Sequence, residues 1–168
     1  MASRANRSGS IAPVGGPGTA ETAAARWITL SSLALALFGL GVAGYLGYEH
    51  HTAATTLSCP DTGVINCLKV TTSTYSRFLG LPVSDLGVAY FAAMVLLCLP
   101  SSWASPNVLV RRARLATSAL GVQFVLYLLW AELFQLDAIC LWCTAVHVIT
   151  VALFGVVAIG SALVDQRD

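Results

Sequence analysis

The sequence is short of charged residues. Only 10% of its 168 residues are Asp, Glu, Lys or Arg, and Lys69 is the only lysine. Soluble domains typically carry about 25% charged residues, so this composition argues against an ordinary soluble globular protein. The formal net charge of +1 provides no basic patch to neutralise phosphates, which argues against nucleic acid as a partner.

Apolar residues are abundant instead: they make up 57% of the chain and occur in blocks separated by short polar joints. A helix needs about 20 mostly apolar residues to cross a bilayer, and lipid offers the backbone no hydrogen-bond partners. We therefore expect an all-α integral membrane protein, a four-transmembrane-helix bundle within residues 26–164. The predicted spans are residues 27–48, 83–103, 115–134 and 138–164.

The first block could instead be a cleaved signal peptide. Its apolar run is long for such a peptide, and no clear A-x-A cleavage site follows it, so a retained span is favoured. Residues 1–25, rich in Gly, Ala, Ser and Pro, are predicted to form a disordered tail. Residues 49–82 form the long loop between the first two spans, and residues 165–168 a short second tail.

The distribution of basic residues predicts the orientation of the spans. The two tails and the joint between spans two and three, which must share one side, carry seven basic residues against two, Lys69 and Arg77, on the other side. The seven are Arg4, Arg7, Arg26, Arg111, Arg112, Arg114 and Arg167. Because cytoplasmic segments carry the excess of Lys and Arg, both termini are predicted to be cytoplasmic.

Four of the five cysteines then face outside, where disulfides persist. Cys59 and Cys67 lie in the long loop, and Cys140 and Cys143 form C-L-W-C at the outer end of span four. With Asp137 as the helix N-cap, Cys140 would lie in the first turn, where the helix dipole stabilises a thiolate. This arrangement favours a disulfide relay. The alternatives are inert structural disulfides and a metal site.

The ordered motifs resemble the vitamin K epoxide reductase family in its bacterial form. They are C-x7-C (Cys59 to Cys67), V-T-T-S-T-Y-S (70–76), G-L-P-V-S-D-L-G (80–87) and the final C-L-W-C. The resemblance covers roughly residues 27–160. It implies a location in the bacterial cytoplasmic membrane and a four-helix bundle around a quinone, with the outer loop as a cap. Some bacterial members of the family carry a fused thioredoxin-like domain; we expect none in this chain, and therefore a separate thiol partner.

The resemblance implies an electron route as well. A separate extracytoplasmic thioredoxin-fold protein would attack the loop pair at Cys59, Cys67 would exchange with Cys140, and Cys143 would lie next to the quinone. The quinone would be of the menaquinone or ubiquinone type, and no metal is expected. Ser73 matches a loop serine or threonine near the family's active-site disulfide; its alternative role is a local hydrogen bond.

The chain also departs from the vertebrate pattern, which has an asparagine before span two and a tyrosine four residues after C-x-x-C. Here His147 holds the later position, which favours a plain quinone over vitamin K epoxide. His147 shares a helix face with Cys140 and Cys143 and could give a hydrogen bond or a proton to a quinone carbonyl. The alternative is a buried histidine bonded to a neighbouring helix.

Other polar and aromatic residues have weaker roles in this interpretation. Tyr127 and Trp142 are predicted to line the quinone pocket, although aromatic residues at membrane interfaces are common. Glu132 is expected to reach the interface, as is Asp85. His50 and His51 follow span one and are predicted to be solvated. Trp130 is grouped with the aromatic residues of the pocket. Cys98 is predicted to be a small buried apolar residue.

The sequence therefore predicts a quinone-dependent thiol oxidase that supports disulfide formation in secreted proteins. A close alternative is a quinone or vitamin K epoxide reductase driven by thiols. A thiolate metal carrier is the alternative from a different class, because Cys pairs and His147 are soft-metal ligands.

Overall fold

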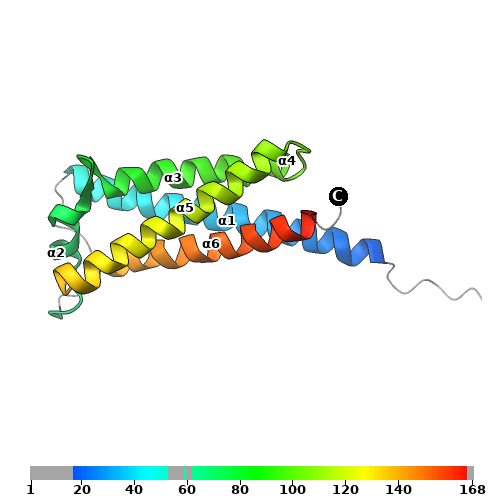
Figure 1. The fold of residues 1–168 in the computed structure, drawn as a ribbon. Coiled ribbons are helices and arrows are strands. Elements are labelled where there is room, and N and C mark those ends of the chain that lie inside the picture. The colour runs from blue at the N-terminus through cyan, green and yellow to red at the C-terminus, as the bar shows by residue number, and fades with distance from the viewer. Residues whose placement is uncertain (1–16, 53–58, 60–61, 166–168) are drawn as a thin grey trace, which may run out of the picture.

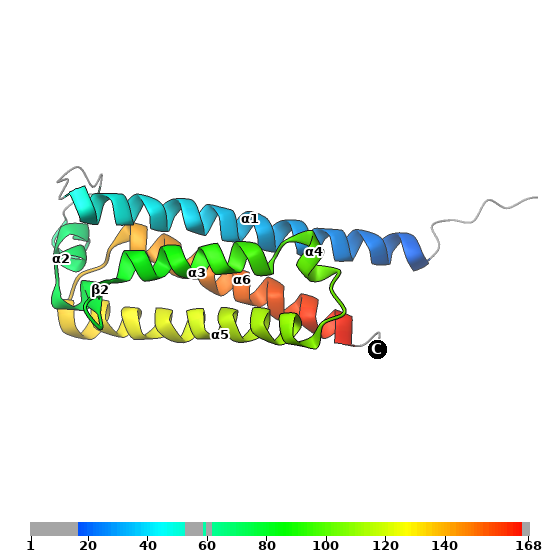
Figure 2. The same ribbon diagram turned by 90° about the horizontal axis from the view of Figure 1, so that it is seen from above.

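The computed structural model describes residues 17–52, 59 and 62–165. Four long helices lie side by side as an elongated bundle (Figures 1 and 2). They are α1 (Pro17–Thr52), α3 (Val83–Leu97), α5 (Val108–Ala131) and α6 (Leu141–Asp165). Helix α1 packs on α3 and α6, and α5 packs on the same two helices, so the four enclose one core.

Three of these helices are long and apolar enough to cross a membrane by length and composition. Their apolar stretches are Ala25–Thr52, Val108–Leu136 and Leu141–Leu163. The predicted span 83–103 differs, because α3 ends at Leu97 and a separate helix, α4 (Pro100–Trp103), follows. Proline removes a backbone donor and clashes with the preceding turn, so Pro100 begins a new helix instead of continuing α3.

Other boundaries also differ from the prediction: α1 ends at Thr52 rather than at residue 48, and α6 begins at Leu141 rather than at residue 138. Helix α1 begins at Pro17, so residues 17–25 are helical rather than disordered, while residues 1–16 and 166–168 lie outside the described residues. Ala23, Ala24 and Ala25 favour helix. Helix α5 begins at Val108, seven residues before its predicted start, with the Asn107 side chain accepting a 2.8 Å hydrogen bond from Leu109 N–H.

The segment before α3 is compact. Asn66 caps helix α2 (Cys67–Thr71) by accepting a hydrogen bond from Lys69 N–H. A 3-10 turn (Thr74–Ser76) follows, and then strands β1 (Arg77–Phe78) and β2 (Leu81–Pro82) pair antiparallel. The two turn residues, Leu79 and Gly80, both have positive φ (52° and 84°), as a two-residue hairpin of type I′ requires.

These elements lie at one end of the bundle, where α1 ends and α6 begins, and α4 lies at the opposite end (Figures 1 and 2). We refer to them as the loop end and the α4 end. The core between them includes Phe91, Met94, Leu153 and Val157. A Cβ atom at Gly39 would overlap the Phe91 ring, so this glycine allows α1 and α3 to approach closely.

Candidate active site

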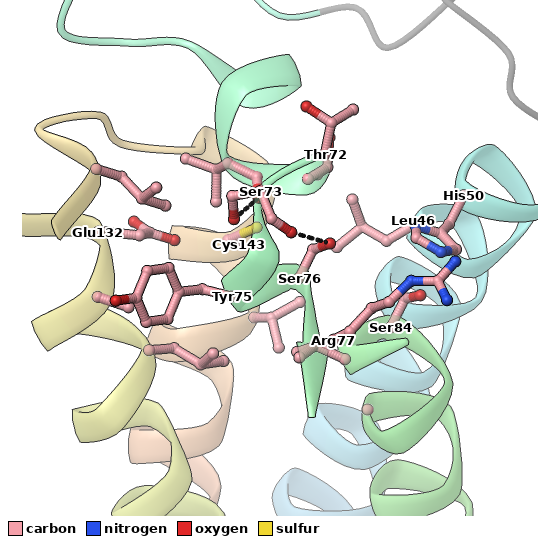
Figure 3. A pocket seen from close by; sticks show the side chains of 18 of the residues that line it. Leu46, His50, Thr72, Ser73, Tyr75, Ser76, Arg77, Ser84, Glu132 and Cys143 are labelled. Carbon is pink, nitrogen blue, oxygen red and sulfur yellow. Dashed lines mark hydrogen bonds between the residues drawn. The ribbon is translucent and has the colours of Figure 1, made fainter. Parts of the chain in front are cut away.

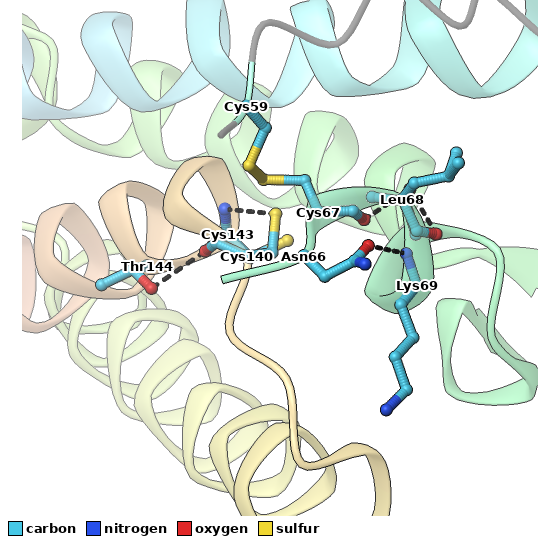
Figure 4. The surroundings of a disulfide bond; sticks show 9 residues. Cys59, Asn66, Cys67, Leu68, Lys69, Cys140, Cys143 and Thr144 are labelled. Atoms are coloured by element: carbon cyan, nitrogen blue, oxygen red, sulfur yellow. Dashed lines mark hydrogen bonds between the residues drawn. A yellow bond between two sulfur atoms is a disulfide. The ribbon is translucent and has the colours of Figure 1, made fainter. Parts of the chain in front are cut away.

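Cys59 and Cys67 form a disulfide at the loop end, with their Cα atoms 6.1 Å apart (Figure 4). Cys67 is the first residue of α2 and is 2% exposed, whereas Cys59 is only partly buried. A thiol from another protein would therefore reach Cys59 before Cys67.

A short parallel β-bridge joins the loop to the segment before α6. Ile65 pairs with Ile139, Asn66 N–H donates to the Ile139 carbonyl oxygen at 3.1 Å, and Ile139 N–H donates to the Val64 carbonyl oxygen at 2.8 Å. In each of the two paired segments, a cysteine follows within two residues of this bridge: Cys67 follows Ile65, and Cys140 follows Ile139. Cys67 and Cys140 consequently belong to one buried cluster, with Cys59 and Cys143 packed against it.

Cys140 lies just before α6, not in its first turn. Asp137 has a left-handed backbone (φ 45°) after the π-helical turn η2 (Glu132–Leu136), so it does not cap α6 as predicted. The Cys140 sulfur itself accepts a 3.3 Å hydrogen bond from Cys143 N–H (Figure 4). Hydrogen bonding from the Cys143 side chain lowers the pKa of the Cys140 thiol, because it stabilises the thiolate.

A cavity of about 930 Å³ lies beside this thiol pair (Figure 3). Its wall comes from all four long helices and from residues of the segment 68–80, so the helices and this segment line one space. Cys143 lines it, and so do Ser73 and His147; the other polar lining residues include Glu49, His50, Tyr75, Arg77, Ser84 and Glu132.

Several buried polar atoms of this wall have no hydrogen-bond partner among the described residues. They are Ser84 Oγ, Glu132 Oε2 and His147 Nδ1. Buried polar groups are normally satisfied, and exceptions require an explanation. A largely apolar cavity with a few convergent polar atoms is the usual form of a small-molecule site. These residues fit a quinone, whose flat apolar ring carries polar oxygens.

The predicted quinone residues divide into two groups. His147, which is 4% exposed, and Ser73 line the cavity, and Ser73 Oγ also donates to the Val70 carbonyl oxygen at 2.8 Å. Trp142 and Tyr127 are not among the lining residues. Trp142 packs on Tyr45, with ring centroids 4.9 Å apart.

Tyr127 belongs to a row of aromatic rings that joins the hairpin to α5. Its neighbours are Phe78, Phe124 and Trp130, with ring centroids 6.0 to 6.2 Å from its own. Both rings were predicted to line the quinone pocket, and both lie outside the residues that line the cavity for the same reason. Sequence position indicates the depth of a residue along a helix but not which neighbour faces it.

Glu132 departs most from expectation. It was predicted to reach the interface, but it is 3% exposed and faces the cavity. One sequence signal could have located Glu132 at the site: an ionisable residue within an apolar span marks a functional site by default. His50 also lines the cavity, whereas His51 forms an exposed 3.0 Å ion pair with Asp85.

Among the described residues, no group of three or more His, Cys, Asp and Glu side chains could hold a metal ion. Cys98 lies in the main core, apart from the cluster of the other four cysteines, and is fully buried, as predicted.

The chain belongs to the vitamin K epoxide reductase family, whose model matches residues 30–158. This match extends from α1 into α6 and confirms the predicted family. No curated protein matches the chain in a sequence search. The family is one of oxidoreductases that generally use quinone-type electron carriers. Because three helices among the described residues are long and apolar enough to cross a membrane, the chain is a multi-pass membrane protein of that family.

Proposed function

We propose that the protein is a quinone-dependent thiol oxidase. It takes electrons from a secreted thioredoxin-fold thiol protein, passes them through Cys59 and Cys67 to Cys140 and Cys143, and delivers them to a membrane quinone. The observation that carries this proposal is the shared burial of Cys67 and Cys140 beside a cavity that Cys143 lines.

The order of transfer follows from exposure and packing. The partner's thiolate attacks Cys59, the less buried sulfur, and a second exchange leaves the loop pair reduced. Cys67 then attacks Cys140, its neighbour in the buried cluster. Cys143 is released from its bond to Cys140 and faces the cavity, so the electrons end on the sulfur nearest the quinone site.

The cavity residues would hold the quinone, which supplies the capacity to take up two electrons and two protons. His147 Nδ1 and Ser84 Oγ have no hydrogen-bond partner in the part of the chain that the structure describes, and they are suited to hydrogen bonds with the quinone oxygens. Such bonds stabilise the negative charge that develops during reduction, and they are strongest where water is excluded. Ser73, held by its bond to Val70, shapes the loop side of the site.

We further propose that the bundle crosses the membrane four times, with α3 and α4 together forming the short crossing. The basic residues Arg111 and Arg112 follow α4, which supports a cytoplasmic α4 end under the positive-inside rule. The loop end then faces outside a bacterial cytoplasmic membrane. A thiol-driven quinone or vitamin K epoxide reductase would use the same route with a different final product.

The proposed function predicts a trapped bridge. Removing Cys59 (Cys59→Ser) leaves the intermediate between the two pairs unresolved, because Cys59 is the thiol that would attack Cys67. During anaerobic incubation with a quinone and a reduced thioredoxin-fold protein, this variant should accumulate a disulfide between Cys67 and Cys140. Cys143→Ser should not accumulate it, because this variant has no helix disulfide for Cys67 to attack and Cys59 remains to resolve any bridge. Peptide mapping detects the bridge, and absorbance follows quinol, which only the wild type should form at a steady rate.

Cys98→Ser is the matched control, because Cys98 lies in the core away from both pairs. It should form quinol at the wild-type rate and trap no bridge. A bridge between Cys59 and Cys143 would contradict the assigned order, and wild-type protein that forms no quinol would contradict the oxidase itself.

A further inference from the structure

Glu132 has a buried carboxyl group beside the cysteine pair Cys140 and Cys143. It lies at the start of η2, at the end of α5, and its side chain is 3% exposed. Burying an ionised carboxylate without a partner costs several kcal/mol. A short hydrophobic side chain at this position would avoid that cost, so the carboxyl group requires a functional reason.

The surroundings of Glu132 are the two thiols. The Cys140 backbone N–H faces its carboxyl group, which is near enough for an electrostatic interaction with both the Cys140 and the Cys143 sulfur. Its second oxygen, Oε2, has no hydrogen-bond partner among the described residues. Glu132 and Cys143 both face the cavity (Figure 3). The carboxyl group therefore lies between the cysteine backbone and the cavity, and its Oε2 is available to a proton.

Exchange between the two pairs requires protons to move as well as electrons. The loop pair begins as two thiols and ends as a disulfide, and the helix pair begins as a disulfide and ends as two thiols. Each bond broken releases a thiolate in a buried site, where an unpaired charge is costly. A nearby acid that gives up a proton at that moment removes the charge.

We propose that Glu132 is the proton-transfer residue for the helix pair, an inference that rests on the proposed direction of electron flow. Cys67 thiolate attacks the Cys140 sulfur, the Cys140–Cys143 bond breaks, and Cys143 leaves as a thiolate that takes the proton of Glu132. Cys59 thiolate then attacks Cys67 and releases Cys140. Two electrons pass from the loop pair to the helix pair. The loop thiols supply the two protons, one by way of Glu132, which is thereby reprotonated.

The test separates the two cysteine pairs and needs no quinone. Fully oxidised protein is mixed with excess reduced thioredoxin-fold protein, quenched with acid at intervals, and alkylated. Mass spectrometry then gives the rate at which each cysteine becomes a thiol. The variants are Glu132→Gln, which keeps the size but cannot carry a proton, and Glu132→Asp, which keeps the acid.

In Glu132→Gln the loop pair should be reduced at the wild-type rate, and the helix pair about 100-fold more slowly, a typical effect of losing a general acid. Glu132→Asp should restore part of that rate. Asp137→Asn is the matched control: it removes an exposed carboxyl group from the same end and suits the left-handed backbone there. It should behave as the wild type.

A second readout is the pH profile for alkylation of Cys143 in reduced protein. A carboxyl group beside the sulfur couples to its ionisation, so Glu132→Gln should displace the profile by on the order of one pH unit, whereas Asp137→Asn should leave it in place. Other titratable or charged groups at the cavity and the thiol cluster are Glu49, His50, Tyr75, Arg77, Cys140 and His147. They are unchanged in both variants.

The proposal is overturned if Glu132→Gln reduces its helix pair within twofold of the wild-type rate, or slows both pairs equally, as a merely structural role would. An undisplaced alkylation profile overturns it as well. Failure of the proposed function is distinguishable, because wild-type protein would then reduce its loop pair without ever reducing its helix pair. The alkylation profile would still report on Glu132.

Discussion

At the loop end of the bundle Glu132 is buried beside Cys140 and Cys143, and at the α4 end Arg114 is buried near Cys98. Both ends thus place one charged side chain close to a thiol. Glu132 Oε2 and Arg114 Nε both lack a hydrogen-bond partner among the described residues, but Glu132 lines a cavity, whereas the Arg114 guanidinium is covered by the Trp103 ring, 3.4 Å from its centre. Each end therefore has a buried charged side chain near a cysteine, but at the loop end the charged group faces a cavity and at the α4 end it is covered by an aromatic ring.

The α4 end is closed by direct packing. Arg114 Nη1 donates to the carbonyl oxygens of Leu97 and Ser102, each at 3.4 Å, and Trp103 Nε1 donates to Ser32 Oγ at 3.2 Å. These bonds hold the break between α3 and α4 against α1 and α5. A Cβ atom on Gly160 would lie 2.6 Å from the Trp103 ring. The charge of Arg114 therefore stabilises the fold. Cys98 and Cys140 are both fully buried, so the comparison teaches that a neighbouring cavity, and not residue type or burial, distinguishes the reactive site from the structural one.

Among the variants that test this comparison between the two ends, His147→Phe is expected to have the largest effect. Phenylalanine at this position removes a hydrogen-bond donor from the cavity, so His147→Phe should slow quinol formation about 100-fold, as loss of one such donor does elsewhere. Its exchange between the loop disulfide and a thiol protein should be unchanged. His147→Tyr should restore part of the rate, because its hydroxyl can donate. Steady-state quinol production and stopped-flow exchange measure the two steps.

Thr150→Val is the control for this prediction. Thr150 is buried three residues further along α6, bonds its own helix at Val146, and is not among the lining residues. Its variant should reduce quinone at nearly the wild-type rate. An unchanged quinone rate in His147→Phe would assign His147 a structural role.

At the α4 end, Arg114→Ala should reduce stability and not activity. It removes the cation over Trp103 and the donor for two carbonyl groups, and it leaves a cavity, so we expect a loss of about 2 kcal/mol. Unfolding in detergent measures this, and Arg112→Ala, an exposed arginine of the same helix, should change stability by less than about 0.5 kcal/mol. A lower rate of thiol exchange in folded Arg114→Ala would break the distinction between the two ends.

The smallest effect is expected for the ion pair at the loop end. His51 Nε2 lies 3.0 Å from both carboxylate oxygens of Asp85, but the two side chains are 60% and 40% exposed. Water and salt weaken such pairs, so Asp85→Asn should cost less than about 1 kcal/mol and leave exchange unchanged. The same unfolding measurement decides this. A larger loss would mean that this pair, like Arg114, holds its end of the bundle together.

Much of the architecture could be predicted from the sequence. Apolar blocks located all four long helices, and the ordered cysteine motifs predicted the family that the match confirms. The sites of individual side chains were harder to predict. His147 and Ser73 were placed at the cavity, but Trp142 and Tyr127 face other aromatic rings, because the rotation of a helix about its axis depends on its neighbours.

The sequence by itself determined that the chain is a helical membrane protein with two cysteine pairs, since hydropathy and spacing are local properties. Only the tertiary structure decided which sulfurs meet. The bridge between Ile65 and Ile139 joins segments more than seventy residues apart and brings Cys67 to Cys140. The tertiary structure also buried Glu132 beside the thiols. Burial of a polar group depends on what packs over it, and the segment that does so here is a loop far away in the sequence.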